Sequence, residues 1–350
     1  MLQTGAIITL ARGAYRLREQ LGSSAYGVVW RADAPWGGAV ALKLINHTQM
    51  ERAHPSLRQR WVDSADKEIV FLGSLEPWDE RHVVRLLDQG RHLDLPVMAL
   101  ELMDTDLARH LAAQRAAGGS TSLDRTLASM AQVNQALAKV HQYGWLYLDL
   151  KPANLLLDGT GAIKLADFGT SRLRRELPAA CYAGTASWQA PEQFFPTASQ
   201  TWDTDTLTDY FALGALFYFL VTGGVQLRFC SNCGNAFRQH QAAGPRALLA
   251  RHGGAIPPTL HDDEAILFAH RIDNPTGAGA DATWCPAAPS AQAQAALALL
   301  RSLLAQEREQ RPRHAIEISR MLDAVRRYLP QASPGRTTTP SASAAAGGRA

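Results

Sequence analysis

The spacing of apolar residues predicts a strand-rich first part of the chain. Apolar and polar residues alternate over 15–21, and short apolar runs bounded by turn residues follow at 28–32, 39–44, 86–87 and 97–102. Period-two alternation and short bounded apolar runs are typical of strands. One helix is predicted among them, over residues 61–75. We therefore expect a small sheet that carries one helix within about the first 100 residues.

The pattern changes to that of helices from residue 107 onward. Apolar side chains recur at every third or fourth position in one segment, at Leu127, Met130, Val133, Leu137 and Val140. This spacing places them on one face of a helix. Residues 211–221 are apolar on almost every side, so we expect that helix in the centre of a core. Further helices are predicted at 291–304 and 315–328, and short strands at 153–157 and 162–165.

These patterns predict an α+β protein with two lobes and a tail. We expect a β-rich lobe at 10–102 and a mainly helical lobe at 103–330. The helical lobe contains an insertion at about 223–260 that is rich in Gly, Ala and Arg. Residues 331–350 have no large apolar side chain. Such a segment cannot offset its ordering entropy by burial, so we predict a disordered tail.

Composition excludes several classes of protein. The chain has 350 residues, of which 46% are hydrophobic, enough for a substantial core. A net charge of +3 is too small to attract nucleic acid or anionic membrane in general. The longest apolar run, 210–221, is shorter than the roughly 20 residues of a membrane-spanning helix. Four cysteines do not make a disulfide framework. We therefore expect a soluble cytoplasmic protein that has no membrane span and binds no nucleic acid.

Two features of the first part could bind phosphate. Residues 21–29 read Leu-Gly-Ser-Ser-Ala-Tyr-Gly-Val-Val, a turn whose backbone N–H groups could face a phosphate, although such a turn could equally be an ordinary hairpin. Lys43 lies in an apolar strand, where its ammonium group needs an anion. Glu68 follows on the predicted helix. This residue either forms a solvated surface pair with Lys43 or holds Lys43 for a nucleotide's phosphates.

Two motifs of the second part could hold a metal ion. The sequence Asp149-Leu-Lys-Pro-Ala-Asn154 is followed, thirteen residues later, by Asp167-Phe-Gly. Short strands flanked by these residues can bring amide and carboxylate oxygens together, and Mg²⁺ prefers such ligands. Asp149 can accept a proton from a hydroxyl group.

This ordered set resembles the eukaryotic-type protein kinase family, and in particular its bacterial Hanks-type serine/threonine members. Ala190-Pro191-Glu192 resembles the end of the activation segment. Asp209 resembles the buried aspartate that anchors the catalytic loop, and Arg311 the arginine that pairs with Glu192. The resemblance runs from about residue 15 to residue 328 and implies a two-lobed kinase fold with ATP between the lobes.

The resemblance also implies roles for individual residues. The catalytic residues would be Lys43, Glu68, Asp149 and Lys151. ATP would be bound by a larger set: Leu21, Gly22, Ser23, Ser24, Gly27, Val29, Ala41, Lys43, Leu100, Glu101, Met103, Asn154, Leu156 and Asp167. Asn154 and Asp167 would hold Mg²⁺, for which Mn²⁺ could substitute. Thr185 would bridge Asp149 and Lys151, as in the serine/threonine branch.

The activity implied is transfer of the ATP γ-phosphate to serine or threonine hydroxyls of protein substrates. The alternative is a pseudokinase that binds nucleotide as a scaffold, because three positions depart from the family pattern. Ser24 replaces a glycine, Tyr147 replaces a histidine and Leu148 replaces an arginine. That arginine normally contacts a phosphorylated residue of the activation segment. We therefore expect a kinase that does not require activation-segment phosphorylation, with regulation by a partner as one possibility.

The insertion carries a cysteine pair, Cys230 and Cys233, followed by glycine. Such a pair resembles half of a zinc knuckle, but a tetrahedral zinc site needs four ligands. Only scattered candidates are available to complete it: His240, His252, His261 and Cys285. The alternative is that the pair is two free thiols in a mobile loop.

Overall fold

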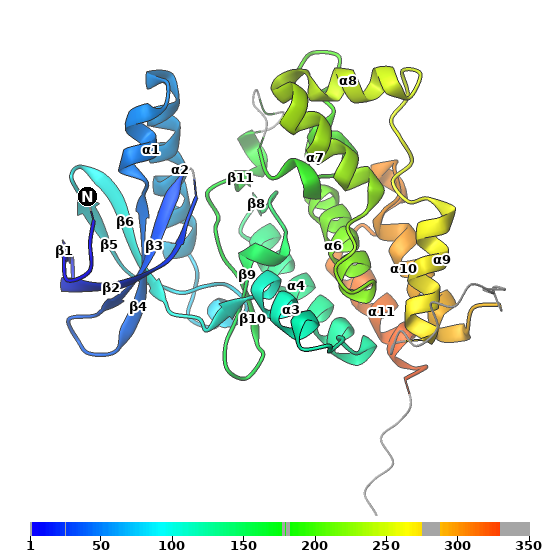
Figure 1. The fold of residues 1–350 in the computed structure, drawn as a ribbon, viewed down its shortest axis with the longest axis horizontal. Helices are drawn as coiled ribbons and strands as arrows, with labels where there is room; N and C mark the ends of the chain where they lie inside the picture. Colours follow the sequence, from blue (N-terminus) through cyan, green and yellow to red (C-terminus); the bar gives the residue numbers. More distant parts are fainter. Residues whose placement is uncertain (1, 25, 177–178, 180–182, 275–287, 330–350) are drawn as a thin grey trace, which may run out of the picture.

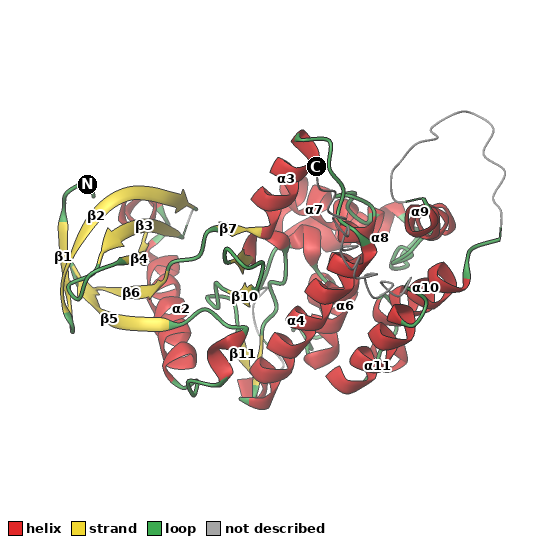
Figure 2. Cartoon of the chain, turned by 90° about the horizontal axis from the view of Figure 1, so that it is seen from below, coloured by secondary structure: helices red, strands yellow, loops and turns green. Residues whose placement is uncertain are grey.

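The computed structural model has a strand-rich lobe and a helical lobe, as the sequence predicts (Figures 1 and 2). It describes residues 2–24, 26–176, 179, 183–274 and 288–329. The predicted tail at 331–350 lies outside the described residues, as does Cys285.

The first lobe is built on a six-stranded antiparallel sheet with the order β1-β2-β3-β4-β6-β5. Its strands are β1 (Ile7–Leu10), β2 (Gly13–Ser23), β3 (Gly27–Asp33), β4 (Ala39–Ile45), β5 (Leu86–His92) and β6 (Leu95–Glu101). Tyr15, Leu17 and Leu42 are fully buried in its core. Strand β1 and the second half of β5 were not predicted.

Two helices follow β4, namely α1 (His47–Arg52) and α2 (Pro55–Gly73). Helix α2 corresponds to the helix predicted at 61–75 and begins earlier, because Pro55 at its first position has a φ angle already suited to a helix. Helix α2 contacts β4, β5 and β6. This packing places Glu68 beside the strand that carries Lys43.

The second lobe is organised around α6 (Thr206–Val221), which is buried along most of its length, as its apolar sequence predicts. Asp205 and Thr208 form a capping box at its start. The other helices of this lobe, apart from the insertion, are α3 (Leu107–Ala116), α4 (Leu123–Gln142), α5 (Pro191–Phe194), α9 (Asp262–Asp273), α10 (Ala291–Leu303) and α11 (Ala315–Arg326).

Short strands lie where the two lobes meet (Figure 1). They are β7 (Thr105–Asp106), β8 (Trp145–Leu146), β9 (Leu155–Leu157), β10 (Ile163–Leu165) and β11 (Arg172–Leu173). Strand β9 pairs with β10 and β7, and β8 pairs with β11. These pairings bring the segment that contains Asp149 next to the segment that contains Asp167.

The insertion at 223–260 is helical, so the expectation of a mobile loop around the cysteine pair is wrong. It forms α7 (Arg228–His240) and α8 (Gly244–Arg251), which pack together. Cys230 and Cys233 are one turn apart on α7 and both are fully buried. Residues three and four apart share a helix face, and here that face is part of the core.

Candidate active site

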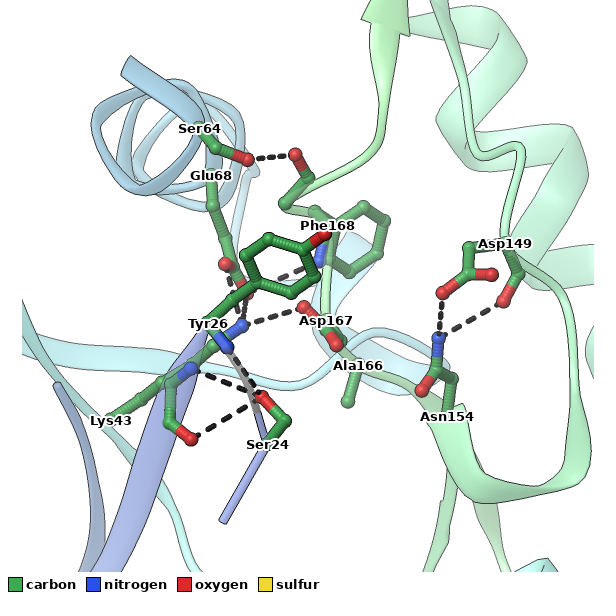
Figure 3. Close-up of polar contacts among 12 residues, drawn as sticks. Ser24, Tyr26, Lys43, Ser64, Glu68, Asp149, Asn154, Ala166, Asp167 and Phe168 are labelled. Carbon is green, nitrogen blue, oxygen red and sulfur yellow. Dashed lines mark hydrogen bonds and ion pairs between the residues drawn. The ribbon is translucent and has the colours of Figure 1, made fainter. Parts of the chain in front are cut away.

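An ion-pair cluster joins the two lobes (Figure 3). The Nζ atom of Lys43 on β4 lies 2.7 Å from Glu68 Oε2 and 2.7 Å from Asp167 Oδ1. Glu68 is 1% exposed, whereas the Asp167 side chain is 52% exposed. The Lys43–Glu68 pair is therefore partly buried, and the interpretation of Glu68 as a solvated surface residue is wrong.

Electrostatics in this cluster favour the charged forms of Lys43 and Asp167. Burial alone would lower the pKa of Lys43, but the carboxylates of Asp167 and Glu68 raise it above its ordinary value. The Lys43 ammonium group lowers the pKa of Asp167. The cluster thus keeps a cation and an exposed anion side by side.

Asp167 and Phe168 are held in place by packing and by backbone contacts. Asp167 has a φ of 60°, a region that aspartate tolerates better than most residues. The N–H of Phe168 donates to Glu68 Oε1 at 3.1 Å. The Phe168 ring lies 4.5 Å from that of Phe71 and 5.1 Å from that of Tyr147. Tyr147, which replaces the histidine of the family pattern, thus packs against Phe168.

A second cluster surrounds Asp149. Lys151 Nζ donates to Asp149 Oδ2 at 2.7 Å, and Thr185 Oγ1 donates to Asp149 Oδ1 at 2.7 Å. Lys151 also donates to Thr185 Oγ1 at 2.7 Å, so Thr185 bridges the two residues. Asn154 Nδ2 donates to Asp149 Oδ2 at 3.0 Å. Burial raises the pKa of Asp149, while the Lys151 and Thr185 hydrogen bonds oppose that increase.

The backbone just before Asp149 is anchored by a buried carboxylate. Asp209 of α6 accepts hydrogen bonds from the N–H groups of Tyr147 at 2.9 Å and Leu148 at 2.7 Å. His141 Nε2 lies 2.8 Å from the same carboxylate. Leu148 has a φ of 65°, which is strained for a bulky residue, and its carbonyl accepts from Gln193 at 2.6 Å. These contacts fix the direction of the segment that presents Asp149.

The end of the activation segment is tied to the helical lobe. Arg311 is buried and donates to Glu192 Oε1 at 2.7 Å and to Glu192 Oε2 at 3.0 Å. A two-point contact between arginine and a carboxylate fixes orientation as well as distance. The activation segment, which carries Thr185, therefore ends at a fixed contact between Glu192 and Arg311.

The turn between β2 and β3 is stabilised by side chains. Ser24 Oγ accepts hydrogen bonds from the N–H of Gly27 at 3.0 Å and of Tyr26 at 3.2 Å. Asn46 Nδ2 donates to the Ser24 carbonyl at 2.9 Å. The Tyr26 ring lies 5.0 Å from that of Trp61 on α2. Sequence reasoning missed Asn46 and Trp61, because neither belongs to a recurrent pattern.

The remaining residues predicted to bind ATP lie around these clusters. Val29 is the cross-strand partner of Lys43, and Ala41 is the partner of Leu100. Glu101 ends β6, and its Oε1 accepts from Lys164 at 2.5 Å. The others lie on neighbouring segments: Leu21, Gly22 and Ser23 on β2, Gly27 on β3, Met103 after β6 and Leu156 on β9.

The donor set of the site fits a magnesium ion. Asn154 uses its Nδ2 to contact Asp149, so its amide oxygen is the group left for a cation. Asp167 offers an exposed carboxylate. Mg²⁺ takes oxygen ligands and is usually held by one or two carboxylates together with substrate phosphates. The two residues are therefore suited to a metal that arrives with a nucleotide.

A zinc site at the cysteine pair is not supported. Within the part of the chain that the structure describes, no group of three or more His, Cys, Asp or Glu side chains could hold a metal ion. Burial raises the pKa of both the Cys230 and the Cys233 thiols, and zinc binds the thiolate form. The pair functions instead as part of the hydrophobic core.

The two-lobed architecture is that of a protein kinase. The protein kinase domain model matches residues 15–321, so the chain belongs to this family. Among the described residues, no helix combines the length and the apolar character needed to cross a bilayer.

Several curated kinases are similar to the chain. Cyclin-dependent kinase B2-1 of Arabidopsis thaliana is 31% identical over 63% of this chain and 69% of its own length. Serine/threonine-protein kinase PknL of Mycobacterium tuberculosis is 31% identical over 58% of this chain and 49% of its own length. DNA damage-responsive serine/threonine-protein kinase RqkA of Deinococcus radiodurans is 28% identical over 92% of this chain and 41% of its own length. The chain thus spans about half or less of the length of the two bacterial relatives. The names of these relatives support the predicted serine/threonine branch.

Proposed function

We propose that the protein transfers the γ-phosphate of ATP to serine or threonine hydroxyls of protein substrates, with Mg²⁺ as the metal. The observation that carries this proposal is the hydrogen-bonded cluster of Asp149, Lys151 and Thr185, with all three contacts at 2.7 Å. Phosphoryl transfer depends on positioning and charge stabilisation more than on covalent chemistry by the protein. The cluster would supply positioning and charge stabilisation, beside the residues proposed to hold Mg²⁺.

The family resemblance implies a role for each residue, and the contacts of the residues support these roles. Lys43, oriented by Glu68, would bind the α- and β-phosphates of ATP. Asn154 and Asp167 would hold Mg²⁺, which neutralises phosphate charge when bound; Mn²⁺ takes similar ligands. Asp149 would orient the substrate hydroxyl and accept its proton, and Lys151 would stabilise charge on the transferred group. Residues 21–29 would cover the phosphates.

The adenine would lie between the lobes. Ala41 and Leu100 are adjacent on β4 and β6, and Leu156 belongs to the nearby β9. Their apolar side chains suit the faces of a planar base, and the backbone of residues 101–103 would offer hydrogen bonds to its edge. The division into lobes at 10–102 and 103–330 stays a proposal, and β1 (Ile7–Leu10) extends the sheet of the first lobe to slightly earlier residues.

The experiment that tests this proposal compares the wild type with Asp149→Asn. Both are incubated with γ-³²P-ATP, Mg²⁺ and a general protein substrate, and the labelled amino acids are identified. General-base catalysis contributes roughly 100-fold or more, so we expect at least that loss in the variant and label on serine or threonine. Equal incorporation by both proteins would favour the pseudokinase alternative.

We also propose that activity does not require phosphorylation of the activation segment. Leu148, at the position of the phosphate-binding arginine, is 4% exposed and has no charge. We therefore expect purified protein to keep its activity after phosphatase treatment. Loss of activity after that treatment, restored by autophosphorylation, would contradict this proposal.

The expected location is the cytoplasm, where ATP and protein substrates are available. The thiols of Cys230 and Cys233 are unbridged, which suits a reducing compartment. Fractionation of cells that express a tagged copy would test this location.

A further inference from the structure

A buried glutamine, Gln193, connects the segment that presents Asp149 to the segment that carries Thr185. Its side chain is 3% exposed, and its Nε2 donates to the Leu148 carbonyl at 2.6 Å and to the Ala183 carbonyl at 3.0 Å. Leu148 directly precedes Asp149 in the sequence. Ala183 lies two residues before Thr185. One amide group therefore holds two backbone segments together, as its two N–H donors allow.

Gln193 is itself held in place by the helical lobe. Glu192, the residue before it on α5, is bound at two points by the buried Arg311. Phe194, the residue after it, is fully buried. The side chain of Gln193 therefore extends from a fixed helix, and its two contacts transmit the position of that helix to both segments.

The close approach of the two segments requires a glycine at position 184. Gly184 has a φ of 99°, in the left-handed region that favours glycine. A Cβ atom there would lie 2.6 Å from Gln193 Nε2. The space that a side chain at position 184 would need is thus occupied by the hydrogen-bonded amide.

The link through Gln193 stands where other kinases use a charged contact. In kinases that are switched by phosphorylation, arginine side chains pair with the phosphate and so order the activation segment. Leu148 has an apolar side chain and contributes its backbone carbonyl instead. We propose that Gln193 is a positioning residue that couples the segment presenting Asp149 to the activation segment without a phosphate. This inference rests on the proposed kinase function and gives a physical basis for activity of the unmodified protein.

The coupling acts on the contact between Asp149 and Thr185. Thr185 Oγ1 donates to Asp149 Oδ1 at 2.7 Å, and this hydrogen bond joins the same two segments. Loss of the Gln193 amide would take this donor away from the carbonyl of Leu148, a residue that is 4% exposed. A buried carbonyl that loses its donor is costly, so the backbone on both sides of the Asp149–Thr185 contact would shift.

A second buried glutamine offers a matched control. Gln189 is 1% exposed and donates to the same Ala183 carbonyl at 2.7 Å. Among the described residues, Gln189 makes no hydrogen bond with the segment that presents Asp149. Its replacement therefore removes a buried amide from the same region and leaves the link to Leu148 intact.

The test compares the wild-type full chain with Gln193→Met and Gln189→Met, all after phosphatase treatment. Methionine has nearly the length of glutamine and no N–H donor. The rate of phosphate transfer from ATP to a general protein substrate is divided by the number of sites that bind ADP in the presence of Mg²⁺, so that unfolded protein is not counted. We expect kcat per site to fall about tenfold in Gln193→Met, with an unchanged KM for ATP. Gln189→Met should keep the wild-type kcat.

Three results would overturn the inference. They are an equal kcat per site in the wild type and Gln193→Met, an equal fall in both variants, and loss of wild-type activity on phosphatase treatment. If the wild type transfers no phosphate even before treatment, the proposed kinase function fails and the inference fails with it.

A shorter pair of variants covers the case in which Gln193→Met does not fold. Gln193→Asn keeps an amide in the core but lacks one methylene group, so it cannot reach both carbonyls, and Gln189→Asn is its control. The same split between kcat and KM is expected. Failure of both Gln193 variants to fold, while the Gln189 variants fold, would assign Gln193 to the core alone and contradict its positioning role.

Discussion

At the scale of single residues, the chemistry depends on how burial and hydrogen bonds set the protonation of Asp149. Its carboxylate is 6% exposed, and burial raises its pKa. Lys151 and Thr185 oppose this by donating to the charged form. A proton acceptor must be deprotonated, so activity should fall as the pH decreases through the pKa of Asp149.

This balance predicts the effect of Thr185→Val on the pH profile. The variant loses the hydroxyl that donates to Asp149 Oδ1, so the pKa of Asp149 should rise further. A hydrogen bond to a charged group contributes about 1.5–3 kcal/mol, equivalent to about 1–2 pH units. We expect the acidic limb of the pH profile of kcat/KM to move to higher pH by about that amount. In Thr185→Ser, which keeps the hydroxyl group, this limb should stay at its wild-type position. An unshifted limb in the valine variant would show that Thr185 does not act through Asp149.

At the scale of elements, helix α7 supports the segment next to Thr185. A Cβ atom at Gly234 would lie 2.8 Å from Ser187 Cβ, and Gln226 donates to the Ser187 carbonyl at 2.5 Å. The short helix Ala186–Trp188 therefore rests directly on α7. The insertion thus helps to position the segment that follows Thr185.

The contact predicts that Gly234→Ala disturbs substrate binding and stability together. Inserting a methyl group into a well-packed contact costs about 1–3 kcal/mol, which urea unfolding would measure. We expect KM for a protein substrate to rise and KM for ATP to stay the same. The control is Gly73→Ala, where the nearest atom to a new Cβ is 4.0 Å away. Normal stability and normal substrate KM in Gly234→Ala would contradict this role of α7.

The environment of helix α7 could not be predicted from the sequence. Residues 230, 233, 234 and 237 have helical spacing, but a cysteine pair followed by glycine also matches a metal knuckle, and short patterns cannot separate the two. Burial decides between them, and burial depends on tertiary packing. The long helices α4 and α6 were predictable because their apolar patterns are long and regular.

At the scale of the whole molecule, the site exists only where the two lobes meet. Lys43 belongs to the sheet, and Asp167 to the helical lobe, yet they lie 2.7 Å apart. The ordered motifs predicted this convergence through the family resemblance. The contact of Asn46 with Ser24 could not be predicted in this way, because the two residues come from separate segments with no shared motif.

The central claim is that Lys43, Asp149, Asn154 and Asp167 together bind a metal-bound nucleotide. Its most direct test is calorimetric titration with ADP, with and without Mg²⁺, of the wild type and Asp167→Asn. We predict that Mg²⁺ strengthens ADP binding to the wild type and that the variant loses this gain. Failure of the wild type to bind ADP would contradict the account. So would an equal strengthening of ADP binding by Mg²⁺ in Asp167→Asn and in the wild type.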